Sequence, residues 1–172
     1  MSDFIDRRRF LAGTAGTLAG FTFVPGRVLG QGGGQPASEK LNIAAIGVGG
    51  MGAANLSAVE NENVVALCDV HPNHAAGTFK KYPQAKTYQD YRVMLDKEDR
   101  NIDAVIIATP DHTHAVIGME CIRRGKHVYL QKPLAHSIYE TRMLTEAARK
   151  HRVQTQMGNQ GHSSNEIRML YE

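Results

Sequence analysis

Short apolar runs alternate with helical segments from Leu41 onward, and this alternation constrains the fold more than any other feature of the chain. The runs are rich in β-branched residues and lie at Leu41–Ile46, Val64–Cys68, Ile102–Ala108, Val128–Leu130 and Val153–Gln156, with a weaker one at Ala85–Tyr88. Nearly continuous apolar strands are typical of parallel sheets, whose two faces are both covered. Strands that alternate with helices then predict an α/β fold with a doubly wound parallel sheet and right-handed crossovers.

Two capping boxes mark helix starts in the second half of the chain. The segment Ser137–Glu140 predicts a helix that runs to about His151. The segment Ser163–Glu166 predicts a second helix, which is still running at Glu172. No internal repeat is visible.

Length and charge limit the classes of protein that the chain can belong to. Its 172 residues suffice for one domain of ordinary size. Residues 1–36 hold four Arg against two Asp, and the rest holds 16 basic and 15 acidic residues. The main body therefore lacks the charge pattern of a nucleic-acid-binding surface. Cys68 and Cys121 lie in apolar stretches without metal-ligand spacing, which favours buried free thiols.

The sequence of residues 1–36 predicts an export signal followed by a Gly-rich linker. Arg7–Leu11 reads Arg-Arg-Arg-Phe-Leu, which resembles the twin-arginine signal, and Phe10–Val24 is uncharged. This apolar stretch is too short for a membrane span of about 20 residues. We expect a periplasmic or otherwise exported protein with no membrane segment in its mature form. A disordered basic tail and an uncleaved anchor are the alternatives.

A glycine-rich loop connects the first strand to the first helix. The loop reads Gly47-Val48-Gly49-Gly50-Met51-Gly52 and fits the pattern G-x-G-x-x-G in its strand–helix context. Gly47 permits a tight turn, Gly49 lets a pyrophosphate approach the backbone, and Gly52 lets the helix pack closely. With Gly50 and Met51, these residues predict a dinucleotide site at the positive end of the helix, within a Rossmann domain of residues 37–162.

Asp69 ends the second strand, 22 residues after the first glycine of the loop. A carboxylate at this point accepts hydrogen bonds from the adenosine ribose hydroxyls and repels a 2′-phosphate. The predicted cofactor is therefore NAD, with NADP disfavoured. The alternative is that Asp69 merely caps the next helix.

Two further segments carry a family resemblance. Ala108–His114 reads Ala-Thr-Pro-Asp-His-Thr-His, and Gly125–Pro133 reads Gly-Lys-His-Val-Tyr-Leu-Gln-Lys-Pro. Together with the glycine loop, they resemble the Gfo/Idh/MocA oxidoreductases, which include glucose–fructose oxidoreductase and inositol dehydrogenase. The resemblance covers Leu41 to about Ser163.

The resemblance implies roles for the residues of these segments. It places a Thr-Pro turn and the residues around it against the dinucleotide, and a catalytic lysine beside the nicotinamide and substrate, with a cis bond after the lysine. The residues assigned to the cofactor site in this way are Thr109, Pro110, His114, Gln131, Lys132 and Pro133. Lys132 is also the assigned catalytic residue. Gln131 departs from the family, which usually has Glu there, and this puts the tuning of the lysine in doubt.

The segment after the sixth strand contains candidate substrate contacts. Asn159, Gln160 and His162 follow a strand whose carboxyl end faces the crevice of an open α/β sheet. The alternative, that they form a polar loop leading into the last helix, stays open. The chain has eight histidines, but neither His71 with His74 nor His112 with His114 has a Cys or carboxylate at ligand spacing, so no metal is predicted.

The family implies an NAD(P)-dependent oxidoreductase acting on a secondary alcohol of a small-molecule sugar, polyol or glycoside. It also implies a second α/β substrate domain, which carries the proton-abstracting residue and forms homo-oligomers. We expect the chain to be truncated before that domain, with residues 163–172 beginning the connection, and to be inactive by itself. The alternatives are an NAD-dependent redox glycosidase and a non-catalytic dinucleotide-binding module.

Overall fold

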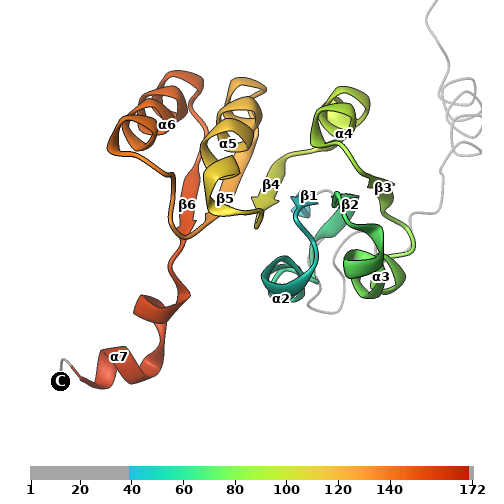
Figure 1. The fold of residues 1–172 in the computed structure, drawn as a ribbon, viewed down its shortest axis with the longest axis horizontal. Coiled ribbons are helices and arrows are strands. Elements are labelled where there is room, and N and C mark those ends of the chain that lie inside the picture. The colour runs from blue at the N-terminus through green and yellow to red at the C-terminus, as the bar shows by residue number, and fades with distance from the viewer. Residues whose placement is uncertain (1–38, 171–172) are drawn as a thin grey trace, which may run out of the picture. The chain divides into compact units, whose positions relative to one another are not determined.

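The computed structural model describes residues 39–170, which form a six-stranded sheet (Figure 1). Each adjacent pair of strands is parallel, and their order is β3-β2-β1-β4-β5-β6. This confirms the predicted parallel α/β sheet. The strands are β1 (Asn42–Ile46), β2 (Asn63–Cys68), β3 (Lys86–Tyr88), β4 (Ala104–Ile107), β5 (His127–Gln131) and β6 (Thr155–Gly158).

Helices cover both faces of the sheet. In Figure 1, α2 and α3 lie on one side, and α4, α5 and α6 lie on the other. Three short 3₁₀ turns, η3 (Asp99–Asn101), η4 (Asp111–Thr113) and η5 (Gln160–Ser163), complete the described elements. The helices are α2 (Gly50–Ser57), α3 (Pro72–Lys81), α4 (Tyr91–Glu98), α5 (His114–Arg123), α6 (Ile138–His151) and α7 (Asn165–Met169).

The side-chain alternation of β1 supplies both hydrophobic cores. Successive side chains of a strand point to opposite faces, and in β1 both sets are apolar. Ile43 and Ala45 join one buried cluster, which includes Leu56 of α2. Ala44 and Ile46 join the other cluster, which the residues of α4, α5 and α6 complete. The central strand is thus buried on both faces, as its continuous apolar sequence predicts.

The strand order creates a switch point between β1 and β4. From β1 the chain winds outward to β2 and β3, and it then returns to β4 and winds to β5 and β6 on the other side. In such a sheet, the crevice at the carboxyl ends of the strands next to the switch point is the usual ligand site. The glycine loop follows β1 and Thr109 follows β4, so both lie at this crevice.

The sixth strand lies two residues later than predicted. Val153–Gln156 was the predicted run, whereas β6 is Thr155–Gly158. Arg152 ends α6 in the left-handed conformation (φ 57°), and the N–H of Val153 donates to Ala148 O. Val153 is therefore used to close the helix end over the core, and pairing with β5 begins at Thr155.

The final helix also differs from its prediction. The capping box at Ser137 is present, with both reciprocal hydrogen bonds to Glu140. The predicted box at Ser163 is wrong, because Ser163 ends η5 and the hydroxyl of Ser164 accepts from the N–H of Ile167 at 3.4 Å. Helix α7 then ends at Met169 instead of continuing through the last residue.

Some of the remaining predictions concern described residues, and one does not. Cys68 and Cys121 are buried free thiols, as predicted, and burial raises the pKa of each to about 12. Between residues 39 and 170, no helix is long and apolar enough to cross a membrane, and no group of three potential metal ligands occurs. The export signal predicted for residues 1–36 lies outside the described residues and stays a prediction.

A buried carboxylate joins α4 to the third strand. Both oxygens of Glu98 accept from Lys86 Nζ (2.8 and 3.0 Å), and Tyr88 and Asn101 donate to one oxygen each. These bonds, that of Lys86 first, lower the pKa of Glu98 from 4.5 to about 2. Because the folded state binds this proton more weakly than the unfolded state, the resulting stability is complete above pH 4.5 and is lost as the pH falls toward 2.

We expect Glu98→Gln to lower the free energy of unfolding at pH 7 by about 2 kcal/mol, less than the pKa shift alone implies because Lys86 is largely exposed. The variant should also lose part of the decline in stability between pH 4.5 and 2. Urea denaturation at both ends of this range measures the two effects. Asp96→Asn, which removes an exposed partner of Arg124, is the matched control. Parallel acid curves for the wild type and Glu98→Gln would contradict the assignment.

Candidate functional site

The glycine loop is held by close backbone contacts that a side chain would prevent. Gly47 has a positive φ (78°), and its N–H donates to Cys68 O at 2.8 Å. A Cβ at Gly47 would lie 2.6 Å from Ala108 O, and one at Gly52 would clash with Gly47 O. The loop therefore packs directly on the chain that leaves β4. This confirms the tight turn predicted at Gly47 and the close approach predicted at Gly52.

Gly49 has a neighbour that the sequence did not predict. The imidazole of His74 lies so close to Gly49 that a Cβ on the glycine would clash with it, and it also faces Gly50. His74 belongs to the first turn of α3, where its backbone N–H donates to His71 Nδ1 (3.1 Å). The His74 imidazole therefore lies against the glycine loop, where a bound pyrophosphate is expected.

Asp69 organises the loop through its carboxylate. Oδ2 accepts from the backbone N–H groups of Val48 (2.9 Å) and Gly49 (3.2 Å), and Oδ1 accepts from that of His71 (2.8 Å). A carboxylate has about four acceptor positions, so one position on Oδ1 is left for a further donor. The Asp69 side chain is 8% exposed and sits beside the crevice. His71, not Asp69, is the N-cap of α3, so the capping alternative is wrong.

These groups line a cavity of about 500 Å³ at the carboxyl ends of β1, β2 and β4. His71 and His74, which the sequence analysis considered only as metal ligands and assigned no role, both line it. Their position directly after the strand that ends in Asp69 was the available signal. The residues that line the cavity include Gly47, Gly49, Asp69, His71, His74, Gln89, Tyr91, Thr109, Pro110 and Thr113.

The Thr109–Pro110 turn forms the opposite wall of this cavity. The hydroxyl of Thr113 lies 2.7 Å from Thr109 Oγ1 and 2.7 Å from Pro110 O, and the N–H of Thr113 also donates to Pro110 O. The turn is therefore fixed by Thr113, the last residue of η4. Its predicted place beside the dinucleotide site is consistent with this position.

Lys132 follows β5 with its backbone fixed and its side chain exposed. Its N–H donates to Oε1 of Gln131 (3.2 Å), and its peptide bond to Pro133 is cis, as predicted. Gln131 itself is buried at 5% exposure. The side chain of Gln131 thus holds the main chain from which the Lys132 ammonium extends.

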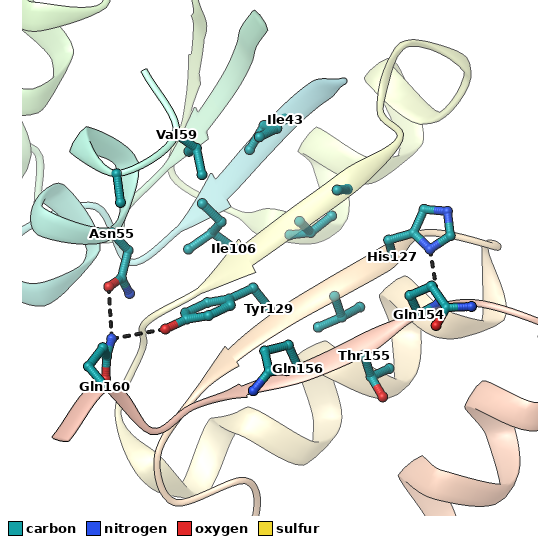
Figure 2. Close-up of a pocket in the computed structure, with 14 residues that line it drawn as sticks. Ile43, Asn55, Val59, Ile106, His127, Tyr129, Gln154, Thr155, Gln156 and Gln160 are labelled. Carbon is teal, nitrogen blue, oxygen red and sulfur yellow. Dashed lines mark hydrogen bonds between the residues drawn. The ribbon is translucent and has the colours of Figure 1, made fainter. Parts of the chain in front are cut away.

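A network of side-chain amides links Lys132 to the glycine-loop helix. Oδ1 of Asn55 on α2 accepts from Gln131 Nε2 (3.3 Å). Oδ1 of Asn55 also accepts from Gln160 Nε2 (3.1 Å), which in turn donates to the hydroxyl of Tyr129 (2.9 Å), as Figure 2 shows. A Cβ at Gly158 would lie 2.9 Å from both Gln131 and Tyr129. The amide Nδ2 of Asn55 is buried without a hydrogen-bond partner. The sequence analysis did not identify Asn55.

The predicted substrate residues are divided by the structure. Gln160 reaches α2 through Asn55, and Asn159 is half-buried with its N–H bonded to Met157 O. His162 is exposed in η5. Gln160 also borders a second cavity of about 520 Å³, which lies along the face of β4, β5 and β6 shown in Figure 2.

His114 differs from its predicted role. It is 0% exposed, and its two ring nitrogens lie against backbone oxygens, Nδ1 at 2.6 Å from Pro133 O and Nε2 at 2.9 Å from Thr109 O. A side chain with no exposed surface does not reach the cavity, so the prediction of a direct cofactor contact is wrong. The ring lies in the interior because a backbone carbonyl from each signature segment, that of Thr109 and that of Pro133, lies next to it.

Comparison with known proteins identifies the family to which this site belongs. Residues 41–159 match the Gfo/Idh/MocA family, described as an oxidoreductase family with an NAD-binding Rossmann fold. The chain belongs to this family. Its cofactor is therefore the NAD of the family's Rossmann fold, as the sequence predicted.

Three relatives show the extent of the likeness. An inositol 2-dehydrogenase from Rubrobacter xylanophilus is 36% identical over 64% of this chain and 32% of its own length. A glycosyl hydrolase family 109 protein from a Shewanella species is 30% identical over 67% of this chain and 27% of its own. The crystal structure of a myo-inositol 2-dehydrogenase from Lactobacillus plantarum superimposes with a TM-score of 0.69 at 25% identity, over 77% of this chain and 40% of that one. The chain spans about a third of the length of the curated relatives that it matches.

Proposed function

We propose that the protein oxidises a secondary alcohol of a polyol of the inositol class with NAD, and that this chain supplies the nucleotide-binding part and the catalytic lysine. One observation carries the proposal. The glycine loop, Asp69 and Lys132 all lie at the carboxyl edge of the sheet, next to the β1/β4 switch point. This edge is where a dinucleotide and a small substrate meet in folds of this type.

The residues present fit the cofactor. The loop leaves no room for a Cβ at Gly47 or Gly52, and the positive end of α2 faces the same crevice, so a pyrophosphate can approach the backbone. The remaining acceptor position on Asp69 Oδ1 fits one ribose hydroxyl. His74 stands beside both and would contact the phosphate end of the adenosine half. When bound, NAD supplies the acceptor for a hydride.

In this proposal, Lys132 is the residue that binds the oxygen of the substrate hydroxyl. Its main chain is held by Gln131, while its side chain is exposed at the end of β5. An ammonium at this place donates a hydrogen bond to the substrate hydroxyl and stabilises the negative charge that develops as the hydride leaves. Gln131 has nearly the same shape as the Glu that is usual in the family, but it carries no charge. The Lys132 ammonium therefore has no carboxylate partner at position 131.

A second candidate is an NAD-dependent glycosidase that oxidises the sugar transiently. The observation that favours it is the likeness to the glycosyl hydrolase family 109 protein over 67% of the chain. Both candidates use the same dinucleotide site and the same lysine, so they differ in the substrate and in whether NADH is a net product.

Absorbance of NADH tests the two candidates when a form of the protein that includes the family's second domain is incubated with NAD and either myo-inositol or an aryl glycoside. Polyol oxidation gives stoichiometric NADH, whereas the glycosidase releases the aryl alcohol with no net NADH. Calorimetry with NAD accompanies both assays. Binding of NAD by this form without reaction on either substrate would contradict both proposals and favour a non-catalytic dinucleotide-binding module.

A further inference from the structure

His114 connects the two signature segments of the site through its ring. It is the first residue of α5, and its nitrogens face Pro133 O (2.6 Å) and Thr109 O (2.9 Å). Thr109 follows β4 and Pro133 follows β5, and these strands are neighbours in the sheet. The ring therefore bridges the carboxyl ends of two adjacent strands, directly behind Lys132.

The two contacts of the ring are both with groups that only accept hydrogen bonds, because a backbone carbonyl oxygen has no proton to donate. The ring has no exposed surface, so it packs between the two carbonyls and makes no contact with solvent.

We propose that His114 positions Lys132 by placing its buried ring between Pro133 O and Thr109 O. Lys132 is then anchored on both sides, since its own N–H is held by Gln131 Oε1 and the following residue is in contact with His114. The carbonyl of Thr109 lies against the same ring, and its hydroxyl accepts from Thr113.

The positioning role can be measured on the protein without any substrate. In His114→Gln, whose single amide nitrogen reaches at most one of the two carbonyls, hydrogen exchange of the Lys132 backbone N–H should accelerate by about 10-fold or more, while the amides of the far end of α5 stay protected. Ile122→Val, a buried substitution at that far end, is the matched control and should leave Lys132 unchanged. Unchanged exchange at Lys132 in a folded His114→Gln protein would overturn this role.

The consequence for catalysis rests on the proposed function. His114→Gln should lower kcat for polyol oxidation by about 10- to 100-fold with little change in the KM for NAD, because only the lysine is displaced. A kcat equal to that of wild type would overturn the positioning role. If the wild type itself does not oxidise polyols, the proposed function fails, while the exchange rate of the Lys132 N–H still decides the positioning role of His114.

Discussion

Replacing Lys132 with Met is expected to lower kcat for polyol oxidation by about 10²- to 10³-fold, the cost of removing one group that stabilises charge in the transition state. Met has a similar length and no charge, so the cis Lys132–Pro133 turn and the bond to Gln131 Oε1 should be retained. The affinity for NAD should change little, because the glycine loop and Asp69 lie on other elements. Steady-state NADH formation together with calorimetry separates the two effects.

Lys97→Met is the matched control for this substitution. Lys97 is an exposed lysine in the last turn of α4, which does not lead into the crevice. It removes the same charge from the protein and should leave kcat unchanged. Equal kcat values for Lys132→Met and the wild type would show that the ammonium takes no part in the reaction.

Asp69→Asn is expected to weaken NAD binding by about 10-fold or more and to lower the free energy of unfolding by about 2 kcal/mol. The carboxylate accepts three backbone N–H groups, two of them from the glycine loop. An amide keeps one oxygen and turns two N–H donors toward these groups, so at least one backbone N–H loses its partner. Both the loop geometry and the ribose contact are disturbed.

The same variant tests the preference for NAD over NADP. In the wild type, a 2′-phosphate would face the Asp69 carboxylate, and we expect NADP to bind about 10-fold more weakly or worse. Asp69→Asn removes this repulsion, so the ratio of the two dissociation constants should narrow. Asp103→Asn removes the same charge from a side chain that accepts from the Asn42 N–H at the start of β1, away from the crevice, so it is the control and should leave the ratio unchanged. Equal binding of the two dinucleotides by the wild type would refute the argument.

The sequence by itself determined the sheet and the place of the cofactor loop. Strands and turns depend on local patterns, and these are written in consecutive residues: continuous apolar runs for buried strands, and glycines where a Cβ does not fit. Gly47 and Gly52 are examples. A Cβ at Gly52 would clash with Gly47 in the same loop, and a Cβ at Gly47 would clash with Ala108 in the neighbouring segment. The family resemblance then added Lys132 and the cis bond that follows it.

The sixth strand shows where local patterns are insufficient. Val153 is the most apolar residue near that strand, yet it closes the end of α6 and lies before the strand. The strand is the polar run Thr155–Gly158, whose register is set by pairing with β5. An edge strand has one neighbour, so fewer of its residues need to be apolar, and the hydrophobic pattern no longer marks its start.

Only the tertiary structure decided which side chains meet at the site. Asp69 bonds to backbone groups 20 and 21 residues earlier, and Gln160 bonds to Asn55, 105 residues away. His114 resembles a cofactor contact in the sequence, but its partners are the carbonyls of Thr109 and Pro133, which it meets because β4 and β5 are neighbours. Local preferences fix where a strand begins and ends, whereas the order of the strands brings their loops together, and that order follows from packing both faces of the whole sheet.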